Sequence, residues 1–170
     1  SGRSDRISIM EDGVPAAMAP YANTSAYFFP NVGRMRTVEV LKGPETLLYG
    51  PQTTSGAINL LSTAIPEQHQ GYVNVEAGDF SSRKIHANYG GTQGQWGYLL
   101  ETYQRTTDGH QKIDRSSRPS GVDTEEYLGK LRWKSDANAR FQQQVDIKYQ
   151  YTQEYANVSY LGLTDEDFRA

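Results

Sequence analysis

The sequence contains no cysteine, which excludes disulfide bonds and thiolate metal ligands. It also lacks long apolar runs, and no stretch approaches the roughly 18 consecutive apolar residues that a transmembrane helix needs. Neither charge sign dominates, because the formal net charge is only −3. A charge this small gives no strong attraction to nucleic acid. These absences exclude disulfide scaffolds, helical membrane anchors and electrostatically driven nucleic-acid binders.

Tyrosine and glycine, in contrast, are frequent, with 12 and 16 residues. Together with many Gln, Asn and Thr residues they indicate a β protein with many turns. The mean hydropathy of −0.70 is typical of a soluble protein. However, a membrane β-barrel has a similarly polar composition, because only alternate residues of its strands face lipid. Composition therefore leaves both classes open, and the strand patterns must separate them.

The segment 38–61 organises the chain. Val38 to Leu41 reads as a short strand, Gly43-Pro44 breaks it, and a short helix is expected to end at Gly50. Proline suits the first helical position and glycine the residue after a helix. A second strand is predicted over residues 56–61. The segment 50–56 lacks the Gly-Lys-Ser/Thr ending of a phosphate-binding loop, so we expect no nucleotide site. The pattern alone indicates an ordinary strand–helix–strand unit.

The order of residues is more specific. The sequence VEVLKGPETLLYGPQTTSGAINLLS at positions 38–62 closely resembles the end of the plug domain of TonB-dependent outer-membrane receptors. The resemblance extends over the whole chain, because the remainder is similar to the first strands of that family's barrel. The positions that match the family's plug motif are Gly43, Pro44, Tyr49, Gly50, Gly56 and Asn59.

Residues 15–30 form a long stretch whose three prolines argue against a continuous helix or a central strand. A turn is expected just before it, at Asp12-Gly13. One interpretation of the stretch is a packed surface loop. The family resemblance implies instead a plug loop that faces the ligand, and a similar run occurs in ferric dicitrate receptors. The candidate ligand-facing residues are Tyr21, Asn23, Thr24 and Tyr27.

Charged residues surround the central strand, with Arg36 and Glu39 before its end and Lys42 after it. The resemblance implies that basic plug residues of this region pair with carboxylates of the barrel wall and hold the plug. Lysine at position 42 could form the charge pair but not the bidentate fork of an arginine. The alternative interpretation is that these are ordinary solvated charges.

A polar segment at 64–70 marks the expected domain boundary, with a plug part at 1–66 and a barrel part at 67–170. Beyond it, apolar and polar residues alternate, as in half-buried strands. Strands are predicted at about 71–79, 83–91, 95–107, 124–134 and 140–153. The polar alternates form one predicted face: Asn74, Glu76, Lys84, His86, Asn88, Glu101, Arg105, Lys130, Arg132, Asp146 and Lys148.

Alternation fits a soluble sandwich nearly as well as a membrane barrel, but two features favour the barrel. Connections at 92–94 and 135–139 read as shorter than the connection at 108–123, as inner turns and outer loops of barrels do. The short connection near residues 80–82 does not fit this rule. Both tryptophans, Trp96 and Trp133, flank the short turns on the apolar face, with Tyr89 and Phe141 beside them. This placement is typical of an aromatic girdle at a membrane interface.

We therefore expect a mainly β fold, namely the C-terminal part of a mixed α/β plug domain followed by the first antiparallel strands of a transmembrane β-barrel. Complete plugged receptors have about 22 strands, so the sequence is interpreted as a fragment. The resemblance implies a Gram-negative outer-membrane transporter for a ferric chelate, such as a siderophore or ferric citrate. Its implied partners are the TonB protein, the chelate and outer-membrane lipid, with no nucleic acid. No enzymatic activity, catalytic residue, metal site or cofactor is expected. The alternatives are a soluble β-rich binding module and a passive porin-like channel.

Overall fold

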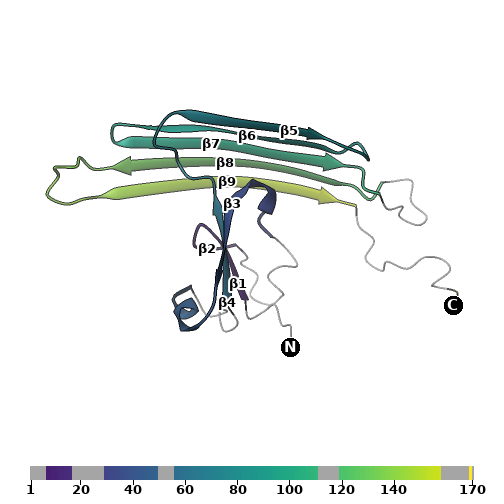
Figure 1. Cartoon of the computed structure of the whole chain (residues 1–170), viewed down its shortest axis with the longest axis horizontal. Coiled ribbons are helices and arrows are strands. Elements are labelled where there is room, and N and C mark those ends of the chain that lie inside the picture. Colours follow the sequence, from purple (N-terminus) through teal and green to yellow (C-terminus); the bar gives the residue numbers. More distant parts are fainter. Residues whose placement is uncertain (1–6, 17–28, 50–55, 111–118, 158–168, 170) are drawn as a thin grey trace. The chain divides into compact units, whose positions relative to one another are not determined.

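The computed structural model describes residues 7–16, 29–49, 56–110, 119–157 and 169. Two compact units divide the chain, Ser1–Ala64 and Ile65–Ala170, and each is built on one β-sheet (Figure 1). The fold is mainly β, as predicted. We call the two sheets the N-terminal sheet and the C-terminal sheet.

The N-terminal sheet has the strand order β2-β1-β4-β3. Its strands are β1 (Ile7–Glu11), β2 (Val14–Pro15), β3 (Met35–Leu41) and β4 (Gly56–Ser62). The parallel neighbour of β4 is β1, and its antiparallel neighbour is β3. Because β4 lies between two strands, its run GAINLLS is largely buried, and Leu60 is fully buried. The strands predicted at 38–41 and 56–61 are thus confirmed.

The predicted break between these strands is also confirmed. Gly43 has a φ of +94°, a conformation that favours glycine. Pro44 then begins the short helix η4 (Pro44–Tyr49), which is a 3₁₀-helix. At the start of β4, Gly56 has a φ of +134°, and a Cβ atom there would lie 3.0 Å from the backbone oxygen of Leu41. Glycine is therefore required at two positions of the motif.

The predicted Asp-Gly turn connects β1 to β2. Asp12 and Gly13 both have positive φ angles, 50° and 80°, and Glu11 pairs with Val14 across the turn. Positive φ at both central residues defines the two-residue hairpin turn for which Asp-Gly is a preferred sequence. The turn brings Asp12 close to the end of β4, which matters for the site below.

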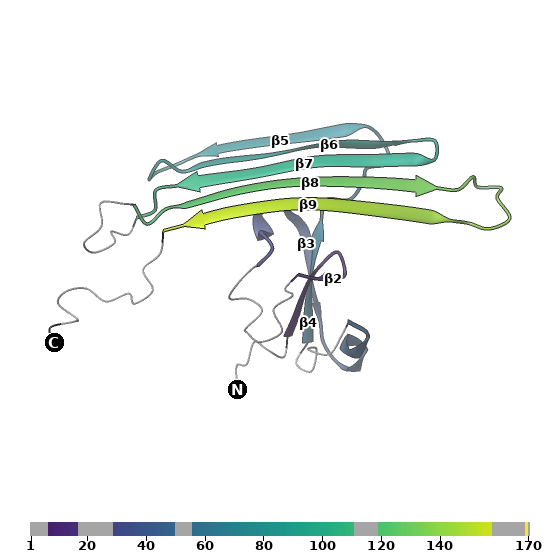
Figure 2. The ribbon, with the colours of Figure 1, turned by 180° about the vertical axis from the view of Figure 1, so that it is seen from behind.

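The C-terminal sheet is an antiparallel meander of five strands in chain order, long and gently curved in Figures 1 and 2. Its strands are β5 (Gln70–Ala77), β6 (Arg83–Gln93), β7 (Trp96–Thr107), β8 (Val122–Lys134) and β9 (Gln144–Ala156). All five predicted strands exist. Each strand pairs only with its chain neighbours, so β5 and β9 form the edges.

The predicted start of the fifth strand, near Arg140, was wrong. The connection from β8 extends over residues 135–143, and β9 begins at Gln144. The Asp136 side chain accepts a hydrogen bond from the Asn138 backbone N–H at 2.8 Å, and the Gln142 amide donates to the Ala137 oxygen at 2.8 Å. These local bonds compete with the sheet for the backbone. As a result, Phe141 lies in the connection and not in the strand, and its side chain is exposed.

The predicted difference in connection lengths is confirmed for three connections, because 94–95 and 135–143 are both shorter than 108–121, whereas 78–82 remains the exception. One end of the sheet has the tight turn at 94–95 and the longer connection 135–143, and the opposite end has the shorter connection 78–82 and the longer 108–121. Each end thus combines a shorter and a longer connection. Length alone therefore cannot tell the two ends of the sheet apart, and the side chains must do so.

Candidate functional site

The N-terminal sheet contains a buried ion pair that the sequence analysis did not identify. The Arg34 guanidinium donates to the Glu11 carboxylate at 2.7 Å, and the two side chains are 1% and 8% exposed. Arg34 ends the 3₁₀ turn η3 (Val32–Arg34), which is capped because the Asn31 side chain accepts a hydrogen bond from the Gly33 N–H. Burial of a charge is costly without a partner. The one available signal was a basic residue within the otherwise uncharged run Val32–Met35.

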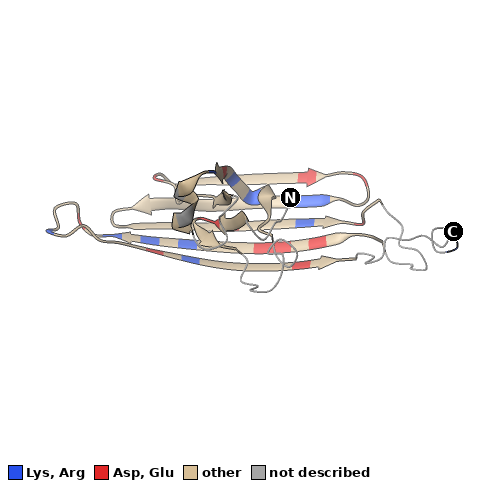
Figure 3. Cartoon of the chain, turned by 90° about the horizontal axis from the view of Figure 1, so that it is seen from below, with Lys and Arg blue, Asp and Glu red and all other residues tan. Residues whose placement is uncertain are grey.

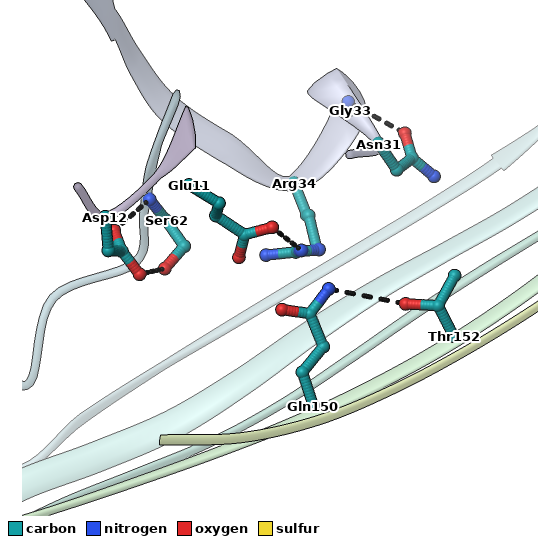
Figure 4. A network of polar contacts seen from close by, with 8 residues as sticks. All are labelled: Glu11, Asp12, Asn31, Gly33, Arg34, Ser62, Gln150 and Thr152. Atoms are coloured by element: carbon teal, nitrogen blue, oxygen red, sulfur yellow. Dashed lines mark hydrogen bonds and ion pairs between the residues drawn. The ribbon is translucent and has the colours of Figure 1, made fainter. Parts of the chain in front are cut away.

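A second group of polar contacts connects the β1–β2 turn to β4 (Figure 4). The Asp12 carboxylate accepts two hydrogen bonds from Ser62, from the backbone N–H at 2.9 Å and from the hydroxyl at 2.6 Å. Asn59 accepts from the Gly13 N–H at 2.9 Å and donates to the Glu39 carboxylate at 2.9 Å. One amide on β4 thus connects this strand to β3 and to the β1–β2 turn. These two hydrogen bonds explain why the predicted motif has an asparagine at position 59.

The three charged residues predicted for a plug contact lie in different surroundings. Glu39 is half-buried and is engaged by Asn59. Arg36 is exposed and lies at an irregularity of β3, where the register with β4 shifts between Met35 and Thr37. Lys42 is exposed just after β3, and neither cation forms an ion pair with the part of the chain that the structure describes.

Tyr49, another predicted motif residue, is described and is 39% exposed at the end of η4. The remaining predicted residues, namely the loop residues Tyr21, Asn23, Thr24 and Tyr27 and the motif residue Gly50, lie outside the described residues.

One face of the C-terminal sheet carries all eleven polar residues predicted for it. Residues that face each other on antiparallel strands share a face, and the register places Glu76, Lys84 and Arg105 in one row and Arg132 beside Asp146. We call this the polar face. Basic and acidic residues separate along β8 (Figure 3), with Lys130, Arg132 and Lys134 toward the 135–143 connection and Glu126 toward the other end; Asp123 and Glu125, also at that end, lie on the opposite face.

Cross-strand contacts connect neighbouring strands on the polar face. Among them are the ion pairs of Lys84 with Glu76 at 2.6 Å and of Arg132 with Asp146 at 2.6 Å, and a hydrogen bond between His86 and Glu101 at 2.8 Å. The His86 ring also meets the edges or faces of Tyr72 and Tyr103, with centroids 5.4 and 5.6 Å apart. Cross-strand pairs of this kind stabilise a sheet. They fix the register and keep the polar side chains on one face.

The opposite face, which we call the apolar face, carries the aromatic cluster. Trp96 lies directly opposite Trp133 in the register, next to the turn at 94–95, and Tyr89 is on the same face. Their predicted placement on one face is confirmed, and Trp96 flanks the tight turn as predicted, whereas the connection after Trp133, 135–143, is longer than predicted. Further along, large apolar side chains are exposed: Leu100 is 65% and Ile147 57% exposed. A continuous exposed apolar face is unusual in a soluble monomer and indicates a partner surface or a membrane.

The chain enters the C-terminal sheet past two glycines. A Cβ atom at Gly97 would lie 2.9 Å from Ile65, and one at Gly90 would lie 3.0 Å from Pro66. Thr92 donates its hydroxyl to the Pro66 backbone oxygen at 2.8 Å. Because glycine has no side chain, Gly90 and Gly97 leave room for residues 65–66. These residues lie at the start of the second unit.

Within the described residues, no group of three or more His, Cys, Asp or Glu side chains is arranged to hold a metal ion. Nor is any helix there both long and apolar enough to cross a membrane. The polar contacts that the structure describes include ion pairs and hydrogen bonds that connect neighbouring strands and turns.

Comparison with known proteins gives a family match for the first part of the chain and similar solved structures for most of it. Residues 1–57 match the family model described as the TonB-dependent receptor plug domain. The fold is similar to that of the siderophore receptor PirA from Acinetobacter baumannii, with 20% identity, a TM-score of 0.62, and coverage of 89% of this chain and 25% of that one. It is also similar to the pyoverdine outer-membrane receptor FpvA from Pseudomonas aeruginosa, with 23% identity, a TM-score of 0.62, and coverage of 85% and 20%. A third similar structure is PirA from Pseudomonas aeruginosa, with 17% identity, a TM-score of 0.54, and coverage of 88% and 27%. The chain thus spans a quarter or less of the length of the first two receptors.

Proposed function

We propose that this chain, whose first 57 residues match the plug domain of TonB-dependent receptors, is part of an outer-membrane receptor that takes up a ferric chelate. The plug match is the observation that carries the proposal. At under 25% identity, the similar solved receptors support the fold of both units. The names of the PirA receptors refer to a siderophore and that of FpvA to pyoverdine, and the substrate class proposed for this chain follows from these names.

The two faces of the C-terminal sheet support a membrane-spanning role. In a barrel that encloses a plug, one face of each strand meets lipid and the other meets a polar interior. The apolar face, with its exposed Leu100 and Ile147 and the Trp96–Trp133 pair, suits lipid and its interface. The polar face, with its cross-strand ion pairs, suits the interior. We place the protein in the outer membrane of a Gram-negative bacterium, with the TonB protein as its energising partner.

In this proposal the protein performs no covalent chemistry. The chelate binds on the outer side, to plug and loop residues among which we place Tyr21, Asn23, Thr24 and Tyr27. The TonB protein then pulls on the plug. The polar contacts of Asp12 with Ser62 and of Glu11 with Arg34 would keep the strands of the plug together until that pull acts.

The test is iron uptake through the full-length receptor that contains this chain. It would be expressed in iron-starved cells that lack their own ferric-chelate receptors, in otherwise identical strains with and without TonB. We expect accumulation of iron from a radiolabelled chelate only where TonB is present. Equal accumulation in both strains would identify a passive channel. No accumulation from any chelate in a broad panel would refute the proposed function.

A further inference from the structure

A small cavity lies on the C-terminal sheet at the end opposite the Trp96–Trp133 pair. Its volume is about 350 Å³, and its lining includes Glu76, Lys84, Tyr103 and Arg105, from β5, β6 and β7. Ser82, from the 78–82 connection, stands at its rim. The cavity lies entirely within one unit, and the ion pairs described above do not account for its charge.

Two cations face each other in this cavity. Lys84 on β6 lies directly opposite Arg105 on β7 in the antiparallel register. Side chains in such positions start only about 5 Å apart at their Cβ atoms, and like charges there destabilise a sheet. A neutral residue at either position would remove that cost. Nearby anions would offset this repulsion between Lys84 and Arg105, and one such anion lies on the neighbouring strand β5.

Glu76 is the anion that pairs with Lys84. Its carboxylate lies 2.6 Å from the Lys84 ammonium and also accepts a hydrogen bond from the Asn74 amide at 2.8 Å. On the other side of Arg105 the row continues to Thr124 on β8 and Glu154 on β9. Thr124 donates its hydroxyl to the Glu154 carboxylate at 3.3 Å, so that acid is engaged two strands away from Arg105.

Arg105 itself is exposed and has no ion pair among the described residues. The charged residues that line the cavity are three cations, Arg83, Lys84 and Arg105, and one anion, Glu76. The Arg105 guanidinium therefore lines a concave, positively charged site, beside an ammonium that Glu76 already holds in place. The buried ring of Tyr103, 3% exposed, contributes a rigid wall to the same cavity.

We propose that this cavity is a carboxylate-binding subsite for the iron chelate, in which the Arg105 guanidinium binds a carboxylate group that projects from the chelate. The planar fork of an arginine matches the two oxygens of a carboxylate. The cavity has the size for one acidic arm rather than for a whole chelate. This inference rests on the proposed function and narrows the substrate class to chelates with free carboxylates.

The test measures chelate affinity on the purified full-length receptor. The probes are a panel of carboxylate-bearing iron(III) chelates, with iron(III) citrate among them, and a neutral iron(III) trihydroxamate. The variants are Arg105→Ala, Glu76→Gln and, as a control, Arg140→Ala. Arg140 is an exposed arginine in the connection at the other end of the sheet, where an acidic arm has no reason to bind.

We expect Arg105→Ala to weaken binding of a carboxylate chelate at least about tenfold, as the loss of a charged hydrogen-bonding partner does. Glu76→Gln should tighten it, because the variant frees the Lys84 ammonium for the ligand. Arg140→Ala should have no effect, and no variant should change binding of the neutral chelate. A heat-dependent shift in gel mobility would verify that each receptor is folded.

Unchanged affinity in folded Arg105→Ala would overturn the subsite. So would a wild-type receptor that imports the neutral chelate with TonB but binds no carboxylate chelate, and in that case the proposed function would stand. A receptor that imports no chelate at all would overturn both. Equal weakening of carboxylate and neutral chelates would also overturn it, because it would show a general effect on the binding site.

Discussion

At the scale of single residues, the buried Arg34–Glu11 pair is the most consequential contact of the N-terminal sheet. It connects the end of β1 to the turn η3 before β3, two segments that no backbone ladder joins directly. A buried pair adds little net stability compared with well-packed apolar residues, but loss of one partner leaves an uncompensated charge. The pair thus makes the position of η3 depend on β1.

Substitution of one partner should therefore destabilise this sheet strongly. We expect Arg34→Met or Glu11→Gln to lower its free energy of opening by about 3–5 kcal/mol, and the double variant to cost less than the sum of the two. The measurement is amide hydrogen exchange of β1, β3 and β4 in the full-length receptor. Thr37→Ser is the control, because that residue is exposed and the change should stay within about 0.5 kcal/mol. Equal effects at positions 34 and 37 would contradict this account.

The same residues show the limit of the sequence analysis. Gly43, Pro44 and Asp12-Gly13 were predictable because backbone conformation at these turns restricts the residue type locally. Arg34 and Glu11 lie 23 positions apart, and their contact depends on how the strands pair. No local pattern encodes such a pairing, so neither residue could be identified before the fold was known.

At the scale of elements, the two-residue period of β5 to β9 predicted which side chains share a face. It did so because alternation is a property of each strand alone. The start of β9 was predicted too early because the residues before Gln144 keep the same apolar–polar alternation as the strand. The hydrogen bonds of Asp136 and Gln142 hold this part of the chain in the connection instead. Phe141 and Gln143 fit the period without belonging to the ladder. Strand existence was thus predictable, whereas this boundary was not.

The face assignment gives a sharp prediction for neighbouring positions in β9. Ile147 lies on the apolar face, opposite Leu131, and Lys148 lies on the polar face, opposite Lys130. Arginine near the middle of a lipid-facing surface costs about 2–4 kcal/mol. We expect Ile147→Arg to destabilise the receptor by that amount and Lys148→Arg to have little effect. Denaturant unfolding of the full-length receptor in lipid vesicles measures both, and similar values would refute the lipid-facing assignment.

At the scale of the whole molecule, the proposed function gives the two units different tasks. The backbone ladders of the first unit are short, and side-chain contacts such as Asn59 to Glu39 add to them. The ladders of the second unit are longer, so more backbone hydrogen bonds must open together. This difference fits a plug that yields and a wall that does not.

Two exposed cations of the first unit remain available for the contact that would hold a plug in place. Arg36 and Lys42 have no ion-pair partner among the described residues, and we predict that at least one meets a wall carboxylate in the intact receptor. An ion pair removed from water is costly to break from one side, so it should restrain the plug without taking part in chelate binding.

Arg36→Ala and Lys42→Ala, singly and together, should therefore leave chelate affinity on whole cells near that of the wild type. At least one variant should alter the rate of TonB-dependent uptake or raise the sensitivity of the cells to detergent, because a loosened plug leaks. Arg140→Ala, which changes an arginine outside the first unit, is the control and should do neither. If the double variant matches the wild type in affinity, uptake and leakage, both residues are ordinary solvated charges. The restraint must then lie in other contacts of the plug.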